Sequence, residues 1–258
     1  MSVASDAREN LVAAKINDLN NQNLVAVRPR ADVSYADVKV TYTPKTGRAK
    51  EAWVEVKMNH TDNLGNVRIS WNGNKWGTSE RGGITPLKKF MMDLLNSGKG
   101  KESADKFLND LAKFVGKNNK NDIVVPTTLG GLDLPNAVTH MQMQNFLKTK
   151  GTQYFINVAD INLGKLVTAH YNSGKSAPVS YMQAADDFYL LGDLDELNLK
   201  RIHPTIPKLE GEGNFKMRVG MRTKYYELQP EIKITDMGSS RFSLTGGNGR
   251  KNPFEGLK

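Results

Sequence analysis

The chain has 258 residues, of which 38% are hydrophobic and 24% charged, so it is long enough for one large globular domain of ordinary composition. It contains no cysteine, which excludes disulfides, thiolate zinc sites and cysteine nucleophiles, and which fits a cytoplasmic protein, or one of the host cytoplasm if the source is viral. Lys and Arg number 36 and Asp and Glu 27, a net charge of +9, and this excess favours a polyanionic partner such as nucleic acid, with solubility alone as the alternative.

The N-terminal part of the chain predicts one helix followed by strands. Residues 6–20 have the spacing of an amphipathic helix, with Asp6 and Glu9 placed as a capping box. Residues 36–43 alternate apolar and polar side chains, as a half-buried strand does. The turn-rich stretch "PKTGRAK" then favours an antiparallel hairpin between the strands on its two sides. Strands are expected at 24–30, 36–43, 51–58 and 67–71.

The remainder of the chain predicts helices and then more strands. Thr85 and Pro86 have the residue types of an N-cap and a first helical position. Helices are expected at 86–96, 102–115 and 136–149; two strands joined by a tight turn at 153–171; and further strands at 214–222 and 225–234. This order predicts an α/β or α+β fold with one mixed β-sheet flanked by helices.

One stretch, "EAWVEVKMN" at residues 51–59, contains candidate catalytic residues. Glu55 and Lys57 share one face of the expected strand, because side chains at i and i+2 of a strand point the same way. Asp37 begins the preceding strand, and antiparallel pairing brings it to the same place. Two carboxylates and the backbone carbonyl of Val56 are hard oxygen ligands of the kind Mg²⁺ prefers, and Lys57 can hold a water or stabilise a charged phosphate oxygen.

The stretch "YADVKVTYTPKTGRAKEAWVEVKMN" resembles the signature of the PD-(D/E)XK nuclease superfamily, which has the restriction-endonuclease-like fold. The resemblance implies that Asp37 and Glu55 are metal ligands and that Lys57 is the catalytic lysine. It also offers Glu9, on the first helix, as a further acid. Ala36 stands where the family name has proline.

The sequence has no linker that would divide the chain into independent domains, and the resemblance extends loosely over about the first 160 residues. We expect a single nuclease domain over residues 1–237, with a core at about 6–160 and a β-rich elaboration at about 161–237. Residues 238–258 are rich in Gly, Arg and Lys and predict a loosely held basic tail.

Other interpretations of these residues remain open. Glu55 and Lys57 can form an ordinary ion pair on a strand, although a lone charge on so apolar a strand is unfavourable without a partner or metal. Asp32 repeats the Ala-Asp-Val pattern of Asp37 and is the alternative ligand. Glu9 can equally be a charge that favours its helix N-terminus.

The leading hypothesis is a Mg²⁺-dependent DNA endonuclease that hydrolyses phosphodiester bonds, with Mn²⁺ able to substitute. The alternatives are a nucleic-acid-binding protein without catalysis, and an RNA nuclease using the same site. A homodimer would supply two sites for two strands, and the sequence has no apolar run of the roughly 20 residues that a membrane-spanning helix needs. Basic side chains near the hairpin are expected to hold phosphates, namely Arg28, Arg30, Lys39, Arg48, Arg68, Lys75 and Arg81.

Overall fold

The computed structural model has two compact units. Unit 1 comprises Met1–Asp62, Asn162–Gly211 and Thr235–Lys258, and unit 2 comprises Asn63–Ile161 and Glu212–Ile234. This division differs from the predicted single domain with a core at about 6–160, because unit 1 draws on three separate parts of the chain. The structure describes residues 3–29, 36–60, 62, 64, 69–78, 84–97, 99–123, 131–132, 141–142, 145–146, 155–158, 162–173, 178–216, 219–221, 226–228, 231–234 and 236–257.

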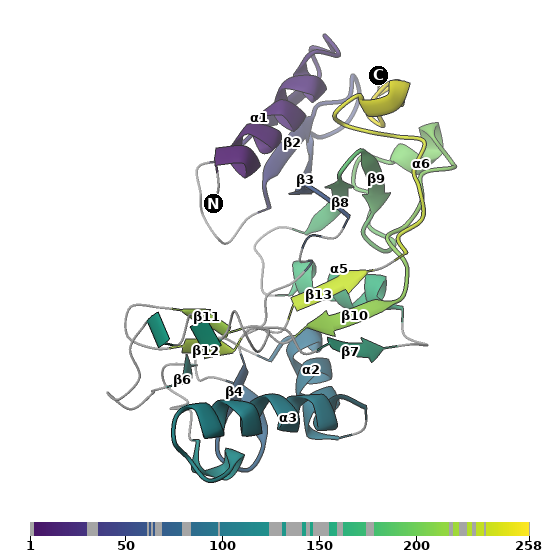
Figure 1. The fold of residues 1–258 in the computed structure, drawn as a ribbon. Helices are drawn as coiled ribbons and strands as arrows, with labels where there is room; N and C mark the ends of the chain where they lie inside the picture. The colour runs from purple at the N-terminus through teal and green to yellow at the C-terminus, as the bar shows by residue number, and fades with distance from the viewer. Residues whose placement is uncertain are drawn as a thin grey trace. The chain divides into compact units, whose positions relative to one another are not determined.

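Unit 1 is built on a five-stranded mixed sheet in the order β1-β2-β3-β8-β9. Its pairs are antiparallel except for the central pair of β3 and β8, which is parallel. The helix α1 packs on β1, β2 and β3, and α5 contacts β8. Figure 1 shows α1 beside β2. The bounds are α1 Val3–Asn17, β1 Leu24–Val27, β2 Val38–Tyr42, β3 Lys50–Lys57, α5 Leu163–Asn172, β8 Val179–Ala184, β9 Asp187–Leu190 and the short α6 Leu199–Ile202.

The hairpin of β2 and β3 forms as its sequence pattern predicts. β2 alternates buried and half-buried residues, and its register places Val38 opposite Val54. In β3 the five residues from Ala52 to Val56 are all buried, which is the pattern of a strand in the middle of a sheet. Val54 and Val56 belong to one core cluster with Val12 of α1.

Residues 163–172 form a helix, where the sequence predicted a strand. Asn162 caps the helix, because its side chain accepts a hydrogen bond from the backbone N–H of Gly164 at 3.0 Å. Leu163, Val167 and Tyr171 follow at four-residue intervals and are all buried on one face. The strand prediction was wrong because it ignored this helical spacing.

The C-terminal segment, residues 238–257, packs on the five-stranded sheet within unit 1, so the prediction of a loosely held tail at 238–258 was wrong for the residues that the structure describes. Phe242, Leu244 and Phe254 lie in the same core cluster as the sheet residues. The backbone N–H of Leu244 donates to the Gln183 side chain at 2.8 Å, which ties the segment to β8. Few apolar residues are enough here because nearly all of them are buried.

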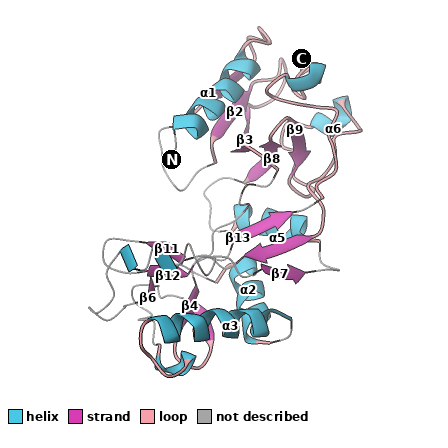
Figure 2. Ribbon diagram, in the orientation of Figure 1, coloured by secondary structure: helices cyan, strands magenta, loops and turns pink. Residues whose placement is uncertain are grey.

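Unit 2 contains two further sheets and two neighbouring helices, α2 and α3, which contact each other (Figure 2). Its sheets have the orders β13-β10-β7 and β11-β12-β4-β5, with β6 pairing with β12. Thr85 caps α2 as predicted, accepting a hydrogen bond from the Lys88 N–H at 3.2 Å, and Pro86 is the first helical residue. The bounds are β4 Ile69–Trp71, β5 Trp76–Thr78, α2 Pro86–Asn96, α3 Lys99–Phe114, β6 Gly131–Leu132, β7 Phe155–Val158, β10 Gly213–Lys216, β11 Val219–Met221, β12 Tyr226–Leu228 and β13 Glu231–Ile234.

The fold is therefore mixed α/β, with a five-stranded mixed sheet flanked by helices, as the sequence predicted. Most of the helix predicted at 136–149 lies outside the described residues. Within the part of the chain that the structure describes, no helix is both long and apolar enough to span a bilayer.

Candidate active site at the end of strands β2 and β3

Asp37 lies at the open end of the β2–β3 hairpin, away from its turn. Its Oδ2 accepts a hydrogen bond from the Val56 backbone N–H at 2.7 Å, just beyond the last β2–β3 pair. The N–H and C=O of one strand residue point to the same side of the strand. The carbonyl of Val56 therefore faces the side on which Asp37 lies.

Glu55 and Lys57 form a contact on one face of β3. The Lys57 ammonium lies 2.8 Å from Glu55 Oε1, and only 11% of the Glu55 side chain and 19% of the Lys57 side chain are exposed. A pair so little exposed to water differs from an ordinary surface ion pair, because neither group is solvated freely. The structure thus brings Asp37, Glu55 and Lys57 together, as the sequence predicted.

Tyr171 of α5 is the residue of this site that the sequence analysis missed. The Lys57 ammonium donates a hydrogen bond to the Tyr171 hydroxyl, and it lies 5.8 Å from the centre of the tyrosine ring. Burial and the nearby Glu55 raise the pKa of Tyr171, so its hydroxyl keeps its proton. The available signal was the four-residue spacing of 163, 167 and 171, which the strand prediction overlooked.

The charges of the site affect each other strongly. Burial, and next the negative charge of Glu55, raise the pKa of Asp37 to about 7, against the opposing hydrogen bond from Val56. Burial opposes the charge of Lys57, but Tyr171 and Glu55 together hold its pKa above the ordinary lysine value. Asp37 and Glu55 therefore share a poorly solvated site with a single lysine, Lys57.

Glu9 is buried near this site but has its own partners. It is 3% exposed, accepts a hydrogen bond from Arg28 Nε at 2.5 Å and another from the Ser5 hydroxyl at 2.9 Å. Arg28 also bonds Asp6 at 2.6 Å. The charge of Glu9 contributes to the raised pKa of Asp37, which puts the two acids within electrostatic reach.

The donor set suits a hard divalent cation with few protein ligands. Among the described residues, no group of three or more His, Cys, Asp and Glu side chains could hold a metal ion. Asp37, Glu55 and the Val56 carbonyl offer oxygen only, and Mg²⁺ commonly takes one or two carboxylates and completes its shell with water and substrate phosphate. Burial and the charge of Glu55 raise the pKa of Asp37, because these two acids lie close together with little water around them.

The predicted phosphate-binding residues are placed in different ways. Arg28 is held by Asp6 and Glu9, and Lys39 pairs with Glu51 at 2.6 Å. Arg48 and Lys75 are exposed, in unit 1 and unit 2 respectively. Arg30, Arg68, Arg81 and the alternative ligand Asp32 lie outside the described residues.

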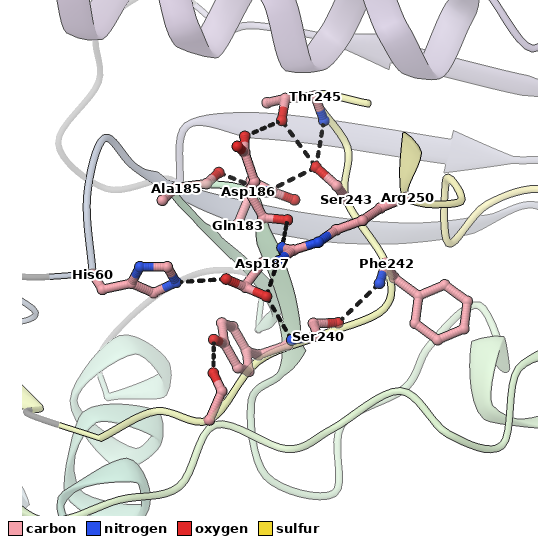
Figure 3. A network of polar contacts seen from close by, with 12 residues as sticks. His60, Gln183, Ala185, Asp186, Asp187, Ser240, Phe242, Ser243, Thr245 and Arg250 are labelled. Atoms are coloured by element: carbon pink, nitrogen blue, oxygen red, sulfur yellow. Dashed lines mark hydrogen bonds and ion pairs between the residues drawn. The ribbon is translucent and has the colours of Figure 1, made fainter. Parts of the chain in front are cut away.

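A second polar network begins just after β3 (Figure 3). Asp187 is 4% exposed, and its two oxygens face two basic side chains. His60 Nε2 lies 2.8 Å from Oδ2, and Arg250 Nη1 donates to Oδ1 at 2.7 Å. The network fastens the C-terminal segment to the turn between β8 and β9.

Comparison with known proteins gives little beyond this geometry. No family model matches the chain, and no curated protein matches it. A solved structure of HhaI endonuclease in complex with DNA aligns over 93% of both chains with 13% identity and a TM-score of 0.31. A likeness at that score carries no argument about fold or function.

Proposed function

We propose that this chain is a Mg²⁺-dependent nuclease that hydrolyses phosphodiester bonds in DNA, with Asp37, Glu55 and Lys57 as its working residues. The observation that carries the proposal is the meeting of these three side chains at one strand end, with low exposure and mutually shifted pKa values. The net charge of +9 supports a polyanionic substrate.

In this proposal Asp37, Glu55 and the Val56 carbonyl would hold the cation. A bound Mg²⁺ would lower the pKa of a water and shield the phosphate charge. Mn²⁺, which accepts similar oxygen ligands, is expected to substitute.

The chain's own groups then orient the reactants. Lys57 is charged at neutral pH because Tyr171 and Glu55 favour the ammonium form. Tyr171 and Glu55 hold the ammonium in place, so it can direct a water or stabilise the charge that develops on a phosphate oxygen. A donor that is already fixed does this without further reorganisation. Asp37 also fixes the backbone of Val56 through its hydrogen bond.

The test is cleavage of supercoiled, linear and single-stranded DNA, and of matched RNA, in Mg²⁺ and in EDTA. We expect Mg²⁺-dependent cleavage in the wild type and a loss of about 10²-fold or more in Glu55→Gln and in Lys57→Met. Glu51→Gln is the matched control, because Glu51 lies on the same strand but is exposed and paired with Lys39.

The outcomes separate the proposal from its alternatives. Equal cleavage rates for Glu55→Gln and Glu51→Gln would show that the proposed site takes no part in the reaction. Binding of DNA without cleavage in either metal would favour a nucleic-acid-binding protein, and preferential cleavage of RNA would make the chain a ribonuclease.

A further inference from the structure

A cavity of about 540 Å³ opens in unit 1 between α6 and the C-terminal segment, and it takes no part in the proposed hydrolysis. Its volume is within the range of small-molecule sites. Three of its lining side chains are Arg241, Arg250 and Lys251, and no carboxylate lies among the residues that line it. The cavity is therefore positively charged.

Arg250 is held in a fixed position. Its Nη1 donates to the Asp186 carbonyl at 2.6 Å and to Asp187 Oδ1 at 2.7 Å, and its side chain is 22% exposed. The guanidinium plane is thus oriented before any ligand binds, which lowers the entropic penalty of binding. Asp187 balances the charge of Arg250, so the excess charge comes from the other two cations.

Arg241 and Lys251 supply that excess charge. Both are exposed, and neither has an ion-pair partner among the residues that the structure describes. A parallel bridge between Phe242 and Lys251 brings the two stretches of the C-terminal segment side by side. The pairing places two unneutralised cations on adjacent stretches at the rim of one cavity.

The loop that carries Arg250 and Lys251 is built closely against the sheet. A Cβ on Gly247 would collide with the Asp186 carboxyl group, so a larger residue there would require that side chain to move. Gly246 and Gly249 both have φ near +70°, where glycine is favoured. The last three residues of the stretch "GGNGRK", Gly249, Arg250 and Lys251, line the cavity.

An aromatic pair, His203 and Phe242, also lines the cavity. The His203 ring packs on Phe242 with centroids 4.9 Å apart, and His203 Nε2 donates to the Glu255 carbonyl at 2.9 Å. Fixed rings beside unneutralised cations suit a ligand with an anionic and an apolar part. A phosphate on a nucleoside has both parts.

We propose that this cavity binds a phosphate group carried by a nucleotide, either free or within a nucleic-acid strand. The unneutralised cations Arg241 and Lys251 match the charge of a phosphate monoester, and the planar guanidinium group of Arg250 matches the arrangement of its oxygens. The inference is independent of the hydrolysis, because it needs neither a metal nor Asp37.

The test is titration of the isotopically labelled full chain in EDTA with inorganic phosphate, adenosine 5′-monophosphate and adenosine, followed by backbone amide NMR. We expect saturable shifts at Arg241, Gly249 and Lys251 with the two phosphates and none with adenosine. In Arg241→Gln/Lys251→Gln the affinity for the nucleotide should fall at least about tenfold. Lys113→Gln/Lys117→Gln, which removes the same charge from exposed residues of unit 2, should leave it unchanged.

Two results would overturn the inference. One is the absence of saturable shifts in the wild type, a measurement that does not depend on how the variants fold. The other is equal affinity in the two double variants. A short single strand that shifts the same amide signals and binds with higher affinity than the mononucleotide would identify the strand as the source of the phosphate. A lower affinity of the strand would identify the free nucleotide as the source. Failure of cleavage with intact phosphate binding would reject the nuclease alone.

Discussion

At the scale of single residues, the hydroxyl of Tyr171 is the feature whose role can be tested most cleanly. It accepts a hydrogen bond from Lys57, and the residue is buried beside β3. Tyr171→Phe keeps the ring and removes only the hydroxyl. The variant therefore tests whether Tyr171 positions the lysine.

We expect Tyr171→Phe to reduce the cleavage rate at saturating DNA, by less than Lys57→Met does, while KM and Mg²⁺ affinity stay unchanged. The pKa of Lys57 should fall, because one group that favours the ammonium is lost. The alkaline limb of the pH–rate profile should then move to lower pH. An unmoved limb with a reduced rate would make Tyr171 a packing residue only.

A second residue-scale prediction concerns Asp37 in the metal-free protein. Its pKa is about 7 in the folded state, above the value of about 3.9 for an unfolded chain. The folded protein thus binds more protons than the unfolded one, so Asp37 should lower stability progressively as pH rises from about 4 to about 7. Urea unfolding in EDTA should show this loss in the wild type and a smaller one in Asp37→Asn, whereas equal pH dependence would contradict it.

At the scale of elements, the buried ion pair of Glu9 and Arg28 joins α1 to the end of β1. Removing Arg28 leaves the Glu9 charge, whose side chain is 4% exposed, without its cation. We expect Arg28→Met to lower the free energy of unfolding by about 1–3 kcal/mol, and the addition of Glu9→Gln to restore part of it. Urea unfolding of the single and double variants measures this.

The same variants decide what Glu9 does. If Glu9 serves the helix, Glu9→Gln should change stability and leave Mg²⁺ affinity, measured by calorimetry, as in the wild type. A large loss of Mg²⁺ affinity would instead place Glu9 in the metal site, the role that the family resemblance offers.

Local patterns predicted some elements well and others poorly. The β2–β3 hairpin and the cap of α2 follow from alternation and from residue types at a helix start, which are local signals. β8, the parallel neighbour of β3, was not predicted, because all six of its residues are buried and the stretch "VSYMQA" does not alternate. Parallel pairing also joins distant parts of the chain, and no local pattern records it.

The candidate site divides in the same way. Asp37, Glu55 and Lys57 lie on one hairpin and could be predicted to meet. Tyr171 comes from α5, more than a hundred residues later, and its approach to Lys57 depends on the β3–β8 pairing. Trp71 and Trp76 are each 2% exposed and pack on each other in unit 2.

At the scale of the whole molecule, the net charge predicts how DNA binding responds to salt. Each phosphate neutralised by Lys or Arg releases counterions, so affinity should fall steeply between about 50 and 200 mM NaCl. Fluorescence anisotropy in EDTA measures the slope, and Asp37→Asn should keep it, because the proposed metal site contributes no positive charge in EDTA. A slope near zero would count against nucleic acid as the partner.

The packing of residues 238–257 on the sheet has a consequence for biosynthesis. A ribosome releases this segment after all five strands of the sheet, yet Phe242, Leu244 and Phe254 complete their core. Until residues 238–257 have been synthesised, the apolar surface of the unit 1 sheet that they cover therefore remains exposed. A nascent chain interrupted before residue 238 would contain Asp37, Glu55 and Lys57 but lack the packing that stabilises the strands beneath them, so we expect the proposed site to assemble only once translation has passed this segment.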